Sequence, residues 1–151
     1  YNNFLSYQNA LTDALLYCQR FCDLAEAQGL GLCFLGTTIY QSQRIIEVLE
    51  LPQLVMPVAT ITLGWPDEAP DASERLPLSA IRHNETYKQA TPESIDRDYT
   101  AKEQMPINKH FVEINHKETL AQVFTDIRYT QADCEQMSIG LLDALKQQGF
   151  M

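Results

Sequence analysis

Residues 29–38 read Gly29-Leu30-Gly31-Leu32-Cys33-Phe34-Leu35-Gly36-Thr37-Thr38 and directly follow a strongly apolar segment. That segment predicts a helix from Thr12 or Asp13 to about Gln28, because either residue can cap a helix start. Its apolar residues cover most of the helix circumference, so we expect a buried, central helix. Gly29 is typical of a left-handed helix end, and residues 31–35 predict a short buried strand.

The elements further along the chain predict an α+β fold. A helix is expected from about Gln41 to Glu50 and is stopped by Leu51-Pro52. Residues 55–63 are apolar and β-branched, which predicts a central strand covered on both faces, with its regular ladder starting after Pro57. Two strands make an incomplete sheet. We therefore interpret residues 1–151, which begin with Tyr1, as one segment of a larger domain whose other strands precede it.

The second half of the chain is predicted to be mainly helical. Residues 78–83 are expected to form a short extended piece, and Thr91-Pro92 predicts the start of a superficial helix that ends near residue 102. A further helix is expected over residues 117–128. The last one starts at Thr130 and reaches about Gln148, where Gly149 ends it.

Composition excludes some classes of function. The net charge is −9, with 20 acidic and 11 basic residues, which argues against binding nucleic acid or an anionic membrane. No apolar run reaches the roughly 18 residues of a membrane span. The cysteines Cys18, Cys22, Cys33 and Cys134 are interpreted as reduced structural thiols, which suits a cytoplasmic protein. The three histidines lack metal-ligand spacing, so we expect no metal site.

Two sequence blocks downstream of residues 29–38 help to identify the chain: Gly64-Trp65-Pro66, and Glu74-Arg75-Leu76-Pro77. In this order, residues 13–87 resemble the second half of the FMN-dependent nitroreductase and flavin reductase family. Residues 113–151 resemble, less specifically, a carboxy-terminal helical extension of such proteins. The resemblance implies a nitroreductase-like fold with a central sheet and a long buried helix, and the family's arginine-rich amino-terminal block is absent.

The resemblance also implies a flavin site. Phe34, Leu35, Gly36 and Thr37 stand where the family packs a small-residue turn against the flavin, since a glycine backbone can closely approach a flat ring. Arg75 stands where the family holds the FMN phosphate. Many relatives carry lysine two positions earlier, and here Ser73 replaces it, so one positive charge is missing. We expect residues 34–37, which we call the corner, and Arg75 to contact the same flavin.

The implied activity is reduction of nitroaromatics, quinones or flavins by two electrons from NAD(P)H, in a ping-pong cycle on FMN. The resemblance names no catalytic acid or base, and it implies a homodimer that serves a small-molecule electron acceptor. Two alternatives stay open. The segment could be a non-catalytic partial domain competent only for dimerisation, or a reductase that uses another flavin or none. A dinucleotide-binding glycine fingerprint is disfavoured, because here the helix precedes the strand.

Overall fold

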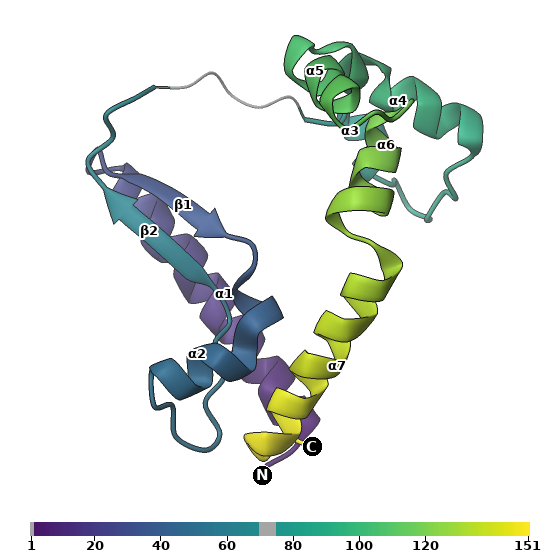
Figure 1. Cartoon of the computed structure of the whole chain (residues 1–151). Coiled ribbons are helices and arrows are strands. Elements are labelled where there is room, and N and C mark those ends of the chain that lie inside the picture. The colour runs from purple at the N-terminus through teal and green to yellow at the C-terminus, as the bar shows by residue number, and fades with distance from the viewer. Residues whose placement is uncertain (1, 70–74) are drawn as a thin grey trace. The chain divides into compact units, whose positions relative to one another are not determined.

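Residues 2–69 and 75–151 are described by the computed structural model of the chain (Figure 1). They divide into two compact units, which are described separately. The first unit comprises residues 1–69 and 132–151, and the second comprises residues 70–131.

The first unit combines helices with a two-stranded antiparallel sheet. Its elements are α1 (Phe4–Glu26), β1 (Gly31–Leu35), the 3-10 helix η1 (Thr38–Gln41), α2 (Ser42–Val48), β2 (Thr60–Gly64) and α7 (Gln131–Gln147). The strands pair in register from Gly31 opposite Gly64 to Leu35 opposite Thr60. Helix α1 runs beside this pair (Figure 1). The predicted α+β class is confirmed.

The hydrophobic core of this unit lies where α1 meets the end of α7. Tyr7, Leu145 and Phe150 are buried there, and Leu11, Met56 and Leu141 pack against them. The rings of Tyr7 and Phe150 lie 5.4 Å apart. Gly149 ends α7 with a φ of 81°, as predicted, because glycine enters the left-handed region without a Cβ clash. Gly29, with a φ of 84°, confirms the predicted stop after α1 in the same way.

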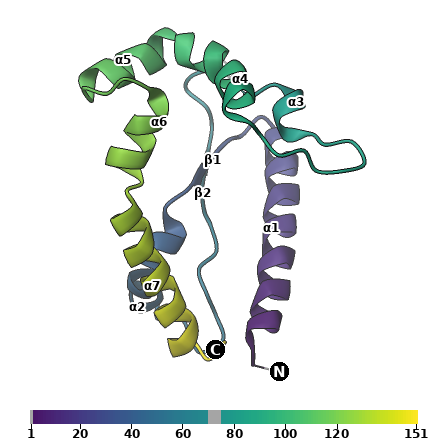
Figure 2. The ribbon, with the colours of Figure 1, turned by 90° about the vertical axis from the view of Figure 1, so that its right-hand side faces the viewer.

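The second unit is helical in the residues described. It contains α3 (Leu78–Ile81), α4 (Pro92–Gln104), α5 (Pro106–Ile114), α6 (Leu120–Val123) and the π-helical segment η2 (Phe124–Arg128), and Figure 2 shows the first four from a second side. Reciprocal capping boxes start α4 at Thr91 and α6 at Thr119. No residue of α4 is buried, which confirms the predicted superficial helix.

Several predicted boundaries were wrong. Helix α1 starts at Phe4 because Asn3 caps it through Ser6 N–H, and the Oγ1 of Thr12 bonds back to Gln8 O within the helix. Strand β2 covers only residues 60–64. Residues 78–81 form a helix, α5 was not predicted, and the single helix expected over 117–128 is instead α6 followed by η2. The Thr119 cap explains the later start of α6.

The predicted burial of the first helix and of both strands was also wrong for this chain. Leu15 is 45% exposed, Leu16 67% and Tyr17 74%. Both strands are largely exposed, and the described sheet has two strands, so neither is flanked on both sides. The helix and strands form where the apolar patterns predicted them. Among the described residues, however, few side chains pack against their apolar surfaces, and a side chain is buried only where another group covers it.

Candidate functional site

The predicted flavin-facing corner lies between β1 and η1. Phe34 and Leu35 are the last residues of β1, and their side chains are 46% and 43% exposed. Gly36 and Thr37 follow outside the strand, and Thr37 O accepts a hydrogen bond from Tyr40 N–H. The structure thus brings four of the six predicted site residues to one exposed turn, as their adjacency in sequence requires.

Thr38, which sequence reasoning did not select, holds this corner in place. Its side chain is 6% exposed, and its Oγ1 contacts Leu35 O at 3.2 Å and Thr60 Oγ1 at 2.9 Å. Thr60 is the ladder partner of Leu35 at the end of the sheet. The corner is therefore tied to β2 by a side chain as well as by the backbone. Its position directly after the predicted site residue Thr37 was the available signal.

Gly36 is open on the side where a side chain would stand. A Cβ built on it meets no atom within 4 Å, and its φ is not positive. Within the described part of the chain, the N–H groups of Gly36 and Thr37 donate to no protein acceptor. Neither packing inside the chain nor backbone strain requires glycine here, so its small size leaves space for a group outside the chain. Two adjacent N–H donors at an open turn suit a flat, acceptor-rich ring.

Arg75 belongs to the second unit. Arg75 is exposed, and none of the ion pairs between described residues involves it. Ser73 lies outside the described residues. Because Gly36 and Arg75 belong to different units, their convergence on one flavin stays a prediction.

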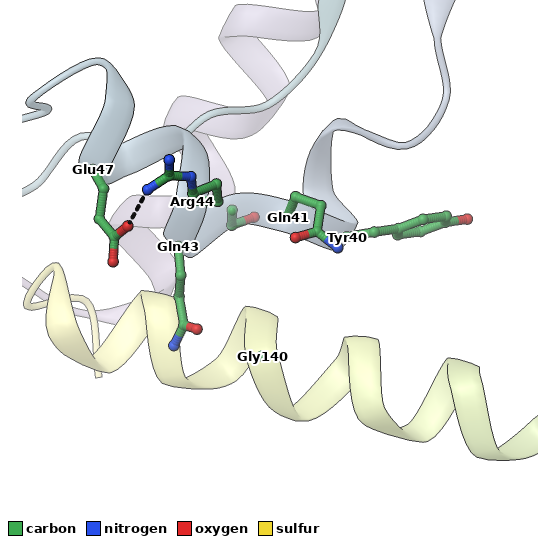
Figure 3. A pocket seen from close by; sticks show the side chains of 7 residues that line it. Tyr40, Gln41, Gln43, Arg44, Glu47 and Gly140 are labelled. Atoms are coloured by element: carbon green, nitrogen blue, oxygen red, sulfur yellow. Dashed lines mark hydrogen bonds and ion pairs between the residues drawn. The ribbon is translucent and has the colours of Figure 1, made fainter.

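Two hollows of the first unit lie next to the corner without including it. One of about 240 Å³ is lined by residues 40–44, Glu47 and Gly140, and Figure 3 shows Gln43 directed toward α7 and Arg44 toward Glu47. The Arg44–Glu47 ion pair measures 3.0 Å and is exposed, so it contributes little stability. A smaller, more apolar hollow of about 170 Å³ lies between Ile39 and Met137. None of residues 34–37 lines either one.

The cysteines and histidines take ordinary positions. Burial, with additional effects from Cys18, Glu26 and Asp23, raises the pKa of the Cys22 thiol, which keeps it protonated and unreactive at neutral pH. Cys33 and Cys134 are exposed. His83, His110 and His116 are exposed. Among residues 2–69 and 75–151, no group of three or more His, Cys, Asp or Glu residues could hold a metal.

No described helix is both long enough and apolar enough to cross a bilayer. No model of a known protein family matches the chain. Individual relatives do match. An oxidoreductase from Bacteroides fragilis NCTC 9343 has a structure that is 54% identical over 100% of this chain, with a TM-score of 0.97, and 61% of that protein is covered.

Matches from Bacillus subtilis extend this similarity. The structure of the NfrA1 nitroreductase is 26% identical, with a TM-score of 0.73, over 99% of this chain and 59% of the other. The FMN reductase (NADPH) of strain 168 is 35% identical over 78 residues, which are 52% of this chain and 31% of the relative.

The chain thus spans about three fifths of the similar structures, and its match covers about a third of the curated relative. The nitroreductase-like fold expected from residues 13–87 is confirmed by these structures. The motifs around Gly36 and Arg75, the α+β architecture and the matched relatives agree, and the chain is similar, over part of their length, to proteins of the nitroreductase and flavin reductase family.

Proposed function

We propose that this chain forms part of an FMN-dependent oxidoreductase that takes hydride from NAD(P)H. The observation that carries the proposal is the corner at residues 34–37, which is tied to β2 through Thr38, is open at Gly36, and has two N–H donors with no acceptor among the described residues. The names of the matched FMN reductase and nitroreductase support the same cofactor and electron donor. When bound, FMN supplies the redox chemistry and the protein supplies position and electrostatics.

The roles of this chain's residues follow from the corner. The backbone N–H groups of Gly36 and Thr37 would donate hydrogen bonds to the flavin ring, on a turn that the Thr38–Thr60 contact stabilises. The exposed apolar side chains of Phe34 and Leu35 would offer surface for a flat ring or its ribityl chain. Arg75 would pair with the phosphate, and Ser73 is the further residue proposed for this role. Nitroaromatics, quinones and free flavins are the proposed electron acceptors in a ping-pong cycle.

Gly36 offers a test that separates a ligand role from a structural one. Gly36→Val places its new atoms where a Cβ meets nothing within 4 Å, so folding stability should change by less than about 1 kcal/mol. If the open side receives FMN, the same substitution should weaken FMN binding at least tenfold, measured by quenching of flavin fluorescence. Binding that survives Gly36→Val unchanged would show that the ring lies elsewhere.

Arg75 is tested by charge removal with a matched control. Arg75→Gln should weaken FMN binding by about tenfold or more, because a charge-assisted bond to phosphate is lost. Riboflavin lacks the phosphate, so its binding should not change. Arg44→Gln, which removes an exposed arginine from α2, is the control and should leave both affinities intact. An equal effect of Arg75→Gln on FMN and riboflavin contradicts the phosphate assignment.

A second candidate is a partial domain competent only for dimerisation, in a cytoplasmic homodimer. The specific observation in its favour is the exposed apolar surface of α1, where Leu15, Leu16, Tyr17, Phe21 and Leu24 are all more than 40% exposed. Such a surface is typical of an interface. A chain that forms dimers but stays colourless after incubation with FMN would support this candidate over the enzyme.

A further inference from the structure

A third hollow, in the second unit, gathers positive charge on an acidic protein. It has a volume of about 460 Å³ and is formed by α3, the start of α4 and the loop between them. Arg82, Lys88 and Arg97 line it, and Asp98 is its one carboxylate among the described residues. The whole chain carries nearly two acidic residues for every basic one, 20 against 11. A local reversal of sign of this kind raises the local concentration of anions.

Two of the three cations have no carboxylate partner among the described residues. Arg97 Nε contacts Asp98 Oδ1 at 3.0 Å, and the Asp98 side chain is only 12% exposed, so that carboxylate is already engaged. Arg82 and Lys88 take part in none of the ion pairs between described residues. Both are therefore available for an anion, and a guanidinium with an ammonium is a donor set that suits phosphate.

Hydrogen bonds stabilise the loop between α3 and α4, which carries Lys88. Lys88 N–H donates to Nδ1 of His83 at 3.1 Å, and Thr86 N–H donates to Asn84 O at 2.8 Å. Because Nδ1 of His83 accepts this bond, the neutral ring carries its proton on Nε2, which remains a donor. Glu85 has a φ of 63°, which turns the chain back sharply. A preformed loop reduces the ordering cost of binding.

An aromatic pair lies in the same hollow. The rings of His83 and Tyr87 have centroids 4.5 Å apart, and Tyr87 is 71% exposed although it belongs to the lining. An exposed tyrosine face beside two free cations offers a stacking surface for a flat heterocycle. The start of α4 adds no further donor here, because Thr91 and Ser94 already satisfy its capping bonds.

We propose that this hollow binds a nucleoside phosphate, with its base against Tyr87 and its phosphate between Arg82 and Lys88. Among the described residues, neither residues 34–37 nor Arg75 lines this hollow, so the proposal rests on other residues than the proposed flavin site. It therefore does not depend on the proposed oxidoreductase function.

AMP is the probe, and the 151-residue chain is titrated with it by calorimetry. Arg82→Gln combined with Lys88→Gln should weaken AMP binding at least tenfold, while Arg44→Gln in the first unit should leave it unchanged. Tyr87→Leu should weaken AMP binding and leave any binding of inorganic phosphate unaltered. All of these positions are exposed, and circular dichroism of each variant checks the fold.

Four results would overturn the proposal. If adenosine binds as tightly as AMP, the cations do not contribute to binding. If inorganic phosphate binds as tightly as AMP, Tyr87 does not contribute. Displacement of AMP by saturating FMN would make this hollow part of the flavin site. Gly36→Val separates the two proposals, because it should lower FMN binding and leave AMP binding intact. A chain that binds FMN but not AMP overturns only the nucleoside phosphate site.

Discussion

Thr38 shows at the scale of one residue how the candidate corner is stabilised. Thr38→Val keeps the shape of the side chain but removes the hydroxyl that contacts Leu35 O and Thr60 Oγ1. Leaving those groups without a partner should lower the free energy of unfolding by about 1–3 kcal/mol, measured by urea titration. Thr37→Val is the matched control, since the exposed Thr37 side chain makes no capping bond, and it should cost less than about 0.5 kcal/mol. Equal losses from both variants would contradict the anchoring role.

A second prediction for single residues concerns pH and the second unit. The hydrogen bond from Lys117 Nζ at 2.9 Å, followed by the one from Thr125, lowers the pKa of Asp126 below its ordinary value of 3.8. A lowered folded-state pKa stabilises the fold above pH 3.8, and this contribution is lost as the pH falls through the lowered pKa. Lys117→Met should therefore reduce the loss of stability on acidification below pH 4, measured by thermal melts. If the variant instead lost stability more steeply as the pH falls below 4, the ion pair with Lys117 would not be the cause of the lowered pKa of Asp126.

At the scale of the element, the two glycines of the α7 region should respond to alanine with opposite signs. Gly140 lies inside α7, where an added Cβ meets nothing within 4 Å, so Gly140→Ala should stabilise by about 0.5–1 kcal/mol. Gly149 has a φ of 81°, and its Cβ would stand 3.4 Å from Gln53 Oε1. Gly149→Ala should destabilise by about 1 kcal/mol or more. Chemical unfolding of both variants checks the signs, and a stabilising Gly149→Ala would mean that the helix end tolerates another backbone conformation.

Helix ends were predictable from the sequence, while strand extent was not. Gly29, Thr91-Pro92 and Gly149 act through their own backbone or through residues a turn away, so their effect can be read locally. Residues 55–59 have the apolar composition of a strand but lie outside the ladder. Instead Gln148, which is 1% exposed, donates to Val55 O at 2.7 Å and Pro52 O at 3.1 Å. A bond between residues more than ninety positions apart leaves no local pattern.

At the scale of the whole molecule, the exposed apolar surface of α1 should govern association. Leu16 is 67% exposed, so Leu16→Asp should leave the fold of the chain intact and reduce self-association, measured by sedimentation velocity. Asn9→Asp adds the same charge to the same side of the helix without removing apolar surface, and it should have a smaller effect. Association that both variants leave unchanged would place the interface elsewhere.

The sequence by itself determined the α+β class, strand 31–35, the principal helix stops and the order of motifs that carries the similarity to nitroreductases and flavin reductases. These depend on backbone preference and on spacing between near neighbours, which are encoded locally. Only the tertiary structure decided that Thr38 anchors the corner to Thr60, that Gly36 is open, and that Arg82, Lys88 and Tyr87 share one hollow. Each of these depends on which side chains meet or fail to meet after folding, and in this chain much of the apolar surface that its pattern assigns to a core faces outward.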